Sequence, residues 1–489
     1  MERGYLPTED VLALNRPGTP LPQPPPLRFR YLPAEWIVAL AFVAFGLWAY
    51  LQTPVSWVRA GVILHRHLAL AFTASSHLMM MLAYSVTLLR YVPEAERRTW
   101  TRNAAFLASA ITLACVLLVP TPQATPIGRL LESSMLGMVL TALTLTLFLP
   151  VAGLVSLRRV VGTIAETALL WGPYLIYFAF CGFALAALPV ATLEVKDPTL
   201  MRMDLSLGFS ASQIAYSWRY DAPWVYDVSS VAYRLLGLLV ALVIARLQIA
   251  RAWAHARRAL FVSFLVGVTG LTCYRIVPAI GPIFAYTPLH RELNTPERQA
   301  EAEATLTAVL EGPGEITVPR RYYRNAMPSL HTAFSLVALT AAWQWRRRFF
   351  WACLPLGFLQ IATTLTLAYH YAVDLIAAVP LSVFCWWLAD RGIRLTPRPG
   401  DEPLPAATPS RWLPFCLLAS VGILLTWAAL APIPPWIAWP LAALAVVAPC
   451  YPALAEFCAK RLPRKRPLTS PAPTEAAPAS PASPDSPPA

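Results

Sequence analysis

The chain has 489 residues, of which 57% are hydrophobic and only 13% are charged, and its net charge is +13. Because soluble globular domains carry about 25% charged residues, this composition excludes an ordinary soluble protein. It favours a protein that crosses a membrane several times. The Lys and Arg residues lie in loops between apolar runs rather than along one basic helix, so we expect no nucleic-acid partner.

Twelve apolar runs are long enough to indicate membrane-spanning helices, which predicts an all-α polytopic membrane protein. Their approximate limits are 34–52, 67–89, 104–120, 132–155, 162–190, 229–248, 259–277, 329–345, 349–368, 371–390, 412–431 and 435–456. The distribution of positive charge predicts their orientation. Of the 39 Lys and Arg residues, 26 fall in inner segments and 11 in outer loops when the N-terminus is placed inside. We therefore expect both termini to be cytoplasmic.

The composition also divides the chain into five regions. Residues 1–31 form a Pro-rich N-terminal tail, and residues 457–489 form a basic and then Pro-, Ala- and Ser-rich tail that is typical of disorder. Between the tails we expect additional N-terminal transmembrane helices over 32–160, a catalytic core over 161–392, and additional C-terminal transmembrane helices over 393–456.

Two short segments carry the candidate chemistry. Residues 369–374 (YHYAVD) place His370 and Asp374 four positions apart, so on a helix they share one face. Residues 325–332 (NAMPSLHT) place His331 after a Pro-Ser pair that is typical of a helix start. The predicted topology brings both segments to the outer membrane face. Ionisable groups in this setting are costly and usually functional, so we expect an active site on the extracytoplasmic side.

These residue types suit phosphoryl transfer. We expect His370 to attack phosphorus, Asp374 to hold its other ring nitrogen, and His331 to protonate the leaving oxygen. Arg275, Arg324 and Ser329 are the candidate phosphate-binding residues, because arginine's planar fork suits phosphate and a helix start offers N–H donors. Arg321 and Arg320 are secondary candidates for the same role. We expect neither a metal ion nor a cofactor.

The two segments resemble the motifs of a known family. Pro-Ser-Leu-His at 328–331 is similar to the central motif of the type 2 phosphatidic acid phosphatase superfamily, and His-Tyr-Ala-Val-Asp at 370–374 is similar to its third motif. The segment that is similar to the third motif most resembles the inositol phosphorylceramide synthase branch. Tyr274 to Pro282 occupies the place of the first motif. The resemblance implies a six-helix core and metal-independent chemistry through a phosphohistidine.

The chain departs from the pattern of that superfamily at two places. The Lys that usually precedes the first motif is absent, and Thr363 and Thr364 stand where the third motif usually has Ser-Arg. The synthase branch departs in the same way, which favours transfer of a phosphoryl-linked headgroup. The residues leave open what neutralises the phosphate.

We therefore predict an integral-membrane enzyme that hydrolyses or transfers phosphoryl groups on a phosphorylated lipid. Its substrate would be a phospholipid or a polyprenyl or sphingolipid phosphate. Two alternatives remain: a twelve-helix transporter or lipid flippase that uses the same polar cluster as a relay, and a lipid-binding homologue without catalysis. The sequence names neither the lipid nor the acceptor, and it does not predict the oligomeric state.

Overall fold

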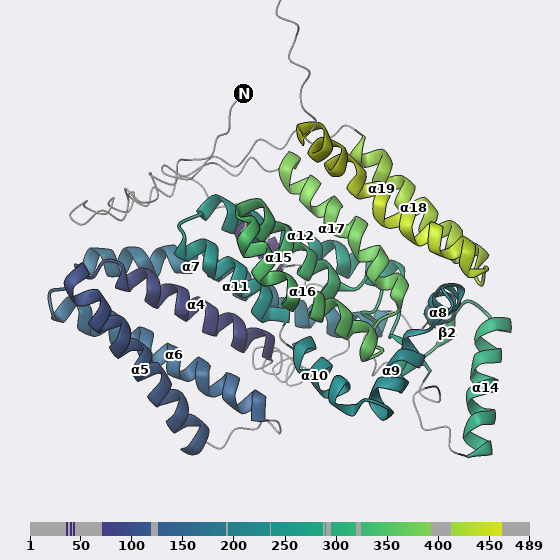
Figure 1. The fold of residues 1–489 in the computed structure, drawn as a ribbon, viewed down its shortest axis with the longest axis horizontal. Helices are drawn as coiled ribbons and strands as arrows, with labels where there is room; N and C mark the ends of the chain where they lie inside the picture. Colours follow the sequence, from purple (N-terminus) through teal and green to yellow (C-terminus); the bar gives the residue numbers. More distant parts are fainter. Residues whose placement is uncertain are drawn as a thin grey trace, which may run out of the picture.

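The computed structural model describes residues 36–37, 40–41, 43–44, 71–118, 126–191, 194–234, 236–286, 289, 295–318, 324–392 and 412–461. These residues are mostly helical, as the sequence predicts (Figure 1). One small antiparallel sheet adds to the expected all-α class. It pairs β1 (Glu194–Val195) with β2 (Ile316–Thr317), in the register Glu194 with Thr317 and Val195 with Ile316.

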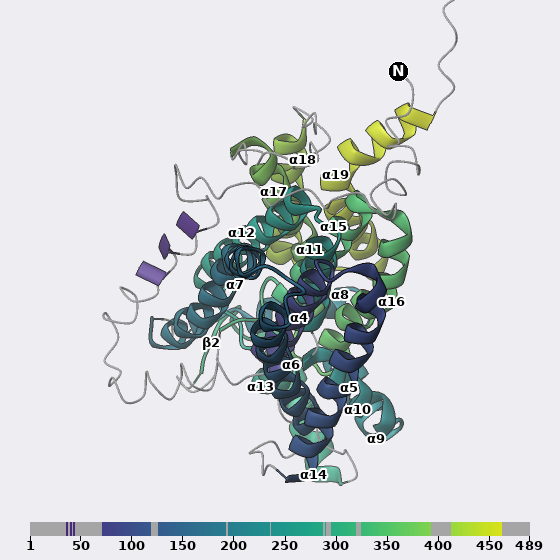
Figure 2. The same cartoon turned by 90° about the vertical axis from the view of Figure 1, so that its left-hand side faces the viewer.

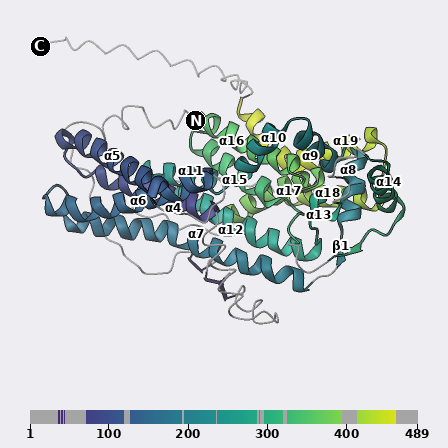
Figure 3. The same cartoon turned by 90° about the horizontal axis from the view of Figure 1, so that it is seen from below.

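The N-terminal helices form a bundle at one end of the molecule. They are α4 (Ala71–Leu89), α5 (Glu94–Leu118) and α6 (Pro126–Val151), followed by α7 (Leu157–Ala191). The Tyr84 hydroxyl and Thr146 Oγ1 lie 2.7 Å apart and join α4 to α6. Seen from below, the α5–α6 hairpin lies at the end of the molecule opposite α14 (Figure 3). The bundle is therefore remote from the segments that carry the candidate chemistry.

The central helices are α7, α11 (Leu236–Ile249), α12 (Trp253–Ile276), α15 (Leu330–Trp345), α16 (Arg347–Thr366) and α17 (Ala372–Gly392). Glycines allow close helix packing, as is usual between membrane helices. A Cβ on Gly267 would lie 1.4 Å from the Tyr177 hydroxyl, and one on Gly270 would lie 2.3 Å from Leu330 Cδ2. The second contact brings α12 against the first residue of α15, one position before His331.

Short elements gather at one end of this helical core. They are α8 (Asp197–Ser206), α9 (Ala211–Tyr220), α10 (Pro223–Arg234), α13 (Pro282–Ala285) and α14 (Pro296–Glu311), together with the small sheet (Figure 1). They come from the segment between α7 and α11 and the segment between α12 and α15. The described parts of these segments are therefore structured, and they surround the helix ends that carry the candidate residues.

The C-terminal hairpin, α18 (Leu413–Leu430) and α19 (Pro435–Arg461), packs beside α17 and also reaches α8 (Figure 2). The Ile433 N–H donates to Ser206 Oγ at 3.0 Å, and the Trp439 indole N–H donates to the Leu207 carbonyl at 3.1 Å. The outward face of α18 is apolar, with Leu418 and Leu425 more than 60% exposed, which suits contact with lipid.

The twelve predicted spans are not confirmed. Among the described residues, five helices are long and apolar enough to cross a membrane, or six if α10 and α11, which meet at 47°, form one bent span. The predicted span over 329–345 corresponds to α15, which has only 16 residues. Most of the predicted span over 34–52 lies outside the described residues. Several apolar helices nevertheless agree with a membrane protein.

Candidate active site

His370 lies in a tight connection between α16 and α17. The last turn of α16 closes with bonds from the Leu367 N–H to the Thr363 carbonyl, 3.2 Å, and from the His370 N–H to the Thr364 carbonyl, 3.3 Å. Ala368 adopts a φ of 51°, a left-handed conformation that is uncommon for a residue with a Cβ. This turn reverses the chain within five residues, so His370 is held directly before the first turn of α17.

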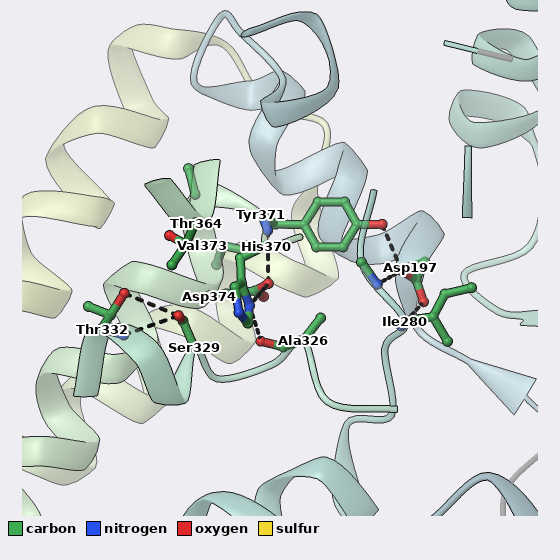
Figure 4. Close-up of polar contacts among 12 residues, drawn as sticks. Asp197, Ile280, Ala326, Ser329, Thr332, Thr364, His370, Tyr371, Val373 and Asp374 are labelled. Atoms are coloured by element: carbon green, nitrogen blue, oxygen red, sulfur yellow. Dashed lines mark hydrogen bonds and ion pairs between the residues drawn. The ribbon is translucent and has the colours of Figure 1, made fainter. Parts of the chain in front are cut away.

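The His370 ring is oriented by a backbone carbonyl as well as by a carboxylate. Its Nδ1 lies 2.8 Å from the Ala326 carbonyl oxygen and 3.4 Å from Asp374 Oδ2 (Figure 4). A carbonyl oxygen only accepts hydrogen bonds, so Nδ1 carries the proton and Nε2 keeps its lone pair. The sequence assigned this orientation to Asp374; in the structure the Ala326 carbonyl makes the shorter contact.

Asp374 is fully buried in the first turn of α17. Its Oδ2 accepts from the Tyr371 N–H at 2.8 Å, while Oδ1 has no hydrogen-bond partner among the described residues. Its backbone carbonyl accepts from the Ser329 N–H at 3.1 Å, which ties the start of α17 to the start of α15. The carboxylate therefore stands 3.4 Å behind the imidazole, where it can stabilise a positive ring.

His331 is the second residue of α15 and faces His370. The two ring centroids are 6.0 Å apart and the rings are inclined at 57°. Tyr233, at the end of α10, stacks on His331 with a centroid separation of 3.9 Å. The structure thus brings together two histidines from helix starts that are 39 positions apart in the chain. Their separation leaves room for one phosphoryl group to be approached by both.

Ser329 caps α15. Its hydroxyl accepts from the Thr332 N–H at 3.3 Å and from the Thr332 hydroxyl at 3.1 Å (Figure 4). This is the standard role of serine at an N-cap. The sequence singled out Ser329 for phosphate binding. In this structure its side chain is committed to the helix start, and contact with phosphate stays a prediction.

The three motif segments are joined by backbone hydrogen bonds. The Ala326 N–H donates to the Ala279 carbonyl at 3.0 Å, and the Ile283 N–H donates to the Ala368 carbonyl at 2.9 Å. Gly281 has a φ of 90°, and a Cβ built there would lie 2.3 Å from the Tyr369 carbonyl oxygen. Only glycine fits this conformation at so close an approach. The segment in the place of the first motif therefore packs directly against the residue before His370.

The four arginines singled out by the sequence differ in their surroundings. Arg324 is fully buried and donates to the Val318 carbonyl at 3.1 Å; burial lowers the pKa of its guanidinium, and the charge of Asp197 opposes that shift. Arg275 is exposed at the end of α12. Arg320 and Arg321 lie outside the described residues. The phosphate-binding role of all four stays a prediction.

Two buried carboxylates that the sequence did not single out support the site. Asp197 accepts from the Ile280 and Gly281 N–H groups, both at 3.0 Å, and from the Tyr371 hydroxyl at 2.8 Å. Asp204 accepts from the N–H groups of Ala372 and Val373, at 3.0 and 3.2 Å. No local pattern marks these residues, because their partners lie more than 80 positions away.

Burial also controls the protonation of these groups. It raises the pKa of Asp197 to about 6 and that of Asp204 to about 8, with the backbone N–H donors opposing the shift in both cases. Burial lowers the pKa of His370 to about 4, and its contact with the Ala326 carbonyl opposes that shift. His370 is therefore neutral at pH 7, which is the state that a nucleophile requires.

Comparison with known protein families gives one match, and it includes the starts of α15 and α17. Residues 198–388 match the PAP2 superfamily. This PAP2 region covers less than half of the chain, includes both histidines and Asp374, and falls within the predicted core of 161–392. The match suggests a phosphatase or phosphotransferase type of activity, but it does not confirm the inositol phosphorylceramide synthase branch. No curated protein and no solved structure matches the chain.

A metal ion would need several ligands in reach of one point. Among the described residues, no group of three or more His, Cys, Asp or Glu side chains is placed to hold one. The expectation that the protein needs no cofactor stays a prediction.

Proposed function

We propose that this protein is a membrane-embedded enzyme that transfers phosphoryl groups from a phosphorylated lipid, through a covalent phosphohistidine at His370. The observation that carries the proposal is the pair of imidazoles 6.0 Å apart, with Nδ1 of His370 committed to the Ala326 carbonyl. This commitment leaves Nε2 as the free nucleophile. The match of the PAP2 region supports the reaction class.

In the first step Nε2 of His370 attacks phosphorus. The Nε2–P bond forms as the P–O bond to the leaving group breaks, and His331 gives a proton to the departing oxygen. Burial and the neighbouring His370 lower the pKa of His331 to about 3 without substrate, so we propose that His331 takes up this proton when the negative phosphate binds beside it and raises that pKa. The imidazole becomes positive as it donates its electron pair. The Asp374 carboxylate, 3.4 Å from Nδ1, stabilises that charge without having to take the proton.

In the second step a hydroxyl group attacks the phosphohistidine. His331, now neutral, removes the proton from that hydroxyl as its oxygen bonds to phosphorus and the Nε2–P bond breaks. Both histidines return to their starting states, so the cycle closes. Water as the acceptor makes the protein a phosphatase, and a lipid or sugar hydroxyl makes it a transferase.

The negative charge of the phosphoryl oxygens needs stabilisation in both steps. The start of α15 supplies the positive end of a helix dipole next to His331, although the Thr332 N–H there is already bonded to Ser329. We propose that Arg324 and Arg275 add positive charge, with Arg320 and Arg321 as secondary contributors. In the predicted twelve-span order, placing the N-terminus inside puts most of the Lys and Arg residues in inner segments. This distribution supports termini on the cytoplasmic side and a site on the extracytoplasmic side.

A hollow beside the site supports a lipid as the substrate. It has a volume of about 440 Å³ and lies between α9 and α16, and the last turn of α16 that lines it ends four residues before His370. Most of its exposed lining is apolar, so we propose that it holds an apolar chain of the substrate. The lining residues are Gln213, Ile214, Ser217, Trp218, Ala362, Leu365 and Thr366.

The proposal is tested by product analysis with the purified protein in detergent. Labelled phosphatidic acid, phosphatidylinositol and a polyprenyl phosphate are incubated separately, with and without a lipid carrying a free hydroxyl. We expect either labelled phosphate or a labelled transfer product, and we expect His370→Ala, His331→Ala and Asp374→Asn to lose it. His255→Ala is the matched control, because His255 lies at the beginning of α12, whereas the part of α12 that packs against the start of α15 is near the end of that helix. Normal turnover by His370→Ala would overturn the mechanism.

The same assay separates the alternatives. A transporter or flippase would move lipid between leaflets of a proteoliposome without changing it chemically, and the His370→Ala variant would then affect movement alone. A homologue without catalysis would bind lipid and leave every labelled substrate intact. Either result would replace the enzymatic proposal.

A further inference from the structure

We propose that α8 is the positioning element of this site: its carboxylates hold the first turn of α17, and the α18–α19 hairpin holds α8 in place. This inference rests on the proposed function, because it concerns the placement of His370 and Asp374. It assigns a role to two buried acids and to C-terminal helices that lie outside the PAP2 region.

Asp204 acts as a remote N-cap for α17. The first N–H groups of a helix have no partner within that helix, and a side chain from a neighbouring residue usually satisfies them. Here the Ala372 and Val373 N–H groups donate instead to the two oxygens of Asp204, at 3.0 and 3.2 Å. Those two residues lie between His370 and Asp374. The Asp204 carboxylate therefore fixes the backbone that sets the spacing of the two groups.

Asp197, at the other end of α8, fixes the residues around that turn. One of its oxygens accepts both the Gly281 N–H and the Tyr371 hydroxyl, and the other accepts the Ile280 N–H. Because Gly281 packs against the Tyr369 carbonyl, this carboxylate holds both sides of the connection that carries His370. Figure 4 shows the Tyr371 ring extending from the site to Asp197.

The C-terminal hairpin reaches α8 through polar and apolar contacts. Ser206 Oγ accepts the Ile433 N–H from the hairpin loop and donates to the Arg202 carbonyl within α8, and the Trp439 indole N–H donates to the Leu207 carbonyl. A single buried cluster joins α8, the start of α17 and the hairpin. Its members include Leu200, Met201, Leu207, Tyr371, Val373, Trp427 and Ala438.

These contacts form a continuous connection from the hairpin through α8 to the first turn of α17. A nucleophile must hold its position to a fraction of an ångström, and a displacement of about 1 Å can cost about 100-fold in rate. The Asp197 and Asp204 side chains bind the groups around His370, namely Ile280, Gly281, Tyr371, Ala372 and Val373, rather than His370 itself. They are positioning residues, so their loss should lower kcat and leave KM unchanged.

The test compares four variants purified in detergent: Asp204→Asn, Asp204→Ala, Ser206→Ala and Trp439→Phe. Each is assayed with labelled phosphatidic acid, phosphatidylinositol or a polyprenyl phosphate, whichever the wild-type protein turns over. The Asn side chain keeps one acceptor oxygen and the Ala side chain keeps none. We therefore expect kcat to be highest for the wild-type protein, lower for Asp204→Asn and lowest for Asp204→Ala, with a loss of about 10- to 100-fold for Asp204→Ala. The Ser206→Ala and Trp439→Phe variants should each lose about threefold. KM should stay within twofold in all four.

Each variant has a matched control. Asp227→Ala removes an exposed carboxylate from α10, Ser420→Ala removes a hydroxyl bonded only within α18, and Trp436→Phe changes an exposed indole on α19. We expect these three variants to keep wild-type kcat. A double-variant comparison adds a sharper requirement. In the Asp204→Ala background, Trp439→Phe should cost less than it does alone, because part of its effect passes through Asp204 and the rest through Asp197.

Amide hydrogen exchange of the peptide that contains residues 369–376 gives a readout that needs no substrate. Exchange should be faster in Asp204→Ala than in Asp227→Ala and in the wild-type protein. Unchanged exchange, or faster exchange with unchanged kcat, would overturn the positioning role. A rise in KM at constant kcat would also overturn it. Absence of turnover by the wild-type protein would instead contradict the proposed function, while the exchange experiment would still measure the contact between α8 and α17.

Discussion

Helices α15 and α17 begin side by side at the same site, but their first N–H groups are satisfied in different ways. Ser329 caps α15 from the adjacent position in the chain. The first turn of α17 instead depends on Asp204, whose partner Ala372 is 168 positions away. The start of α15 carries His331, and the start of α17 carries Asp374 and directly follows His370. One half of the site is thus locally determined, and the other half depends on distant parts of the chain.

This difference affects how strongly the position of each histidine depends on the rest of the fold. A local cap forms with its helix and does not depend on the rest of the fold. A remote cap transmits any movement of α8 or the α18–α19 hairpin to His370, the proposed nucleophile. We expect substitutions far from the site to affect the His370 side of the reaction more than the His331 side.

The largest effect should separate the two histidines themselves. His370→Ala removes the nucleophile and should lower kcat by about 10⁴-fold or more, whereas His331→Ala removes an acid and should cost about 10²- to 10⁴-fold. A substrate ester with an acidic alcohol as leaving group needs no proton in the first step, so in kcat/KM, which reports that step, it should recover most of the His331→Ala loss and none of the His370→Ala loss. Equal recovery in both variants would contradict the assigned roles.

Gly281→Ala should give the next largest effect, because the added Cβ would meet the Tyr369 carbonyl one residue before His370. We expect kcat to fall by about 10- to 100-fold. Gly153→Ala is a matched control, since Gly153 also has a positive φ, of 70°, but has no atom within 4 Å of the added Cβ. A kcat for Gly281→Ala close to that of Gly153→Ala would contradict the importance of the close approach between Gly281 and the Tyr369 carbonyl.

The pH profile tests whether His370 is neutral. Burial lowers the pKa of His370 to about 4, so the ring loses its lone pair only as the pH falls through that value. The substrate should be a phosphodiester lipid whose leaving group is an acidic alcohol, because it neither titrates in this range nor needs a proton from His331. With this substrate, kcat/KM at pH 5 should stay within twofold of its value at pH 7. A histidine with the ordinary pKa of about 6.5 would lose roughly 30-fold over the same interval.

The proposed chain-binding hollow predicts an effect on KM and not on kcat. Ala362→Trp fills the hollow between α9 and α16, so we expect KM for a long-chain substrate to rise about tenfold, and KM for a short-chain analogue to stay unchanged. Ala352→Trp, on an exposed part of α16 near its beginning, is the control. An equal rise in KM for both chain lengths would contradict the assignment.

Ser329→Ala should give the smallest effect on the rate. It removes a local cap, which costs about 1 kcal/mol of stability, and we expect kcat to fall by no more than about threefold. A thermal unfolding measurement should therefore detect the change more readily than a kinetic one. If KM rises tenfold instead, Ser329 contacts the phosphate, as its place in the sequence motif suggested.

The sequence predicted those parts of the site that depend on neighbours along the chain. The spacing of His370 and Asp374 predicted that they share one face of a helix; in the structure they lie 3.4 Å apart, although His370 is in the connection before α17 and not in the helix. The Pro-Ser pair predicted a helix start at His331, and α15 begins there. The sequence also predicted that the described residues are mainly helical. A pattern of this kind is readable because a helix repeats every 3.6 residues and its start requires a cap.

The remaining features could not be read in this way. The Ala326 carbonyl, which makes the shorter contact to His370, is a backbone group that every residue possesses. In the sequence Asp197 and Asp204 fall between two predicted spans and resemble ordinary solvated acids, whereas the fold places both in α8 and buries them. The number of spans was also uncertain from hydropathy alone, because short apolar helices such as α15 pack inside the protein and resemble membrane-crossing segments.

The most direct test of the account is to trap the covalent intermediate. Purified protein is mixed with a phosphate-labelled lipid, denatured within milliseconds to seconds, and digested, and the labelled peptide is sequenced. The account predicts a label on His370 that is stable in base and lost in acid, absent from His370→Ala and slow to form in His331→Ala. Turnover without any labelled histidine, or a label on another residue, would contradict it.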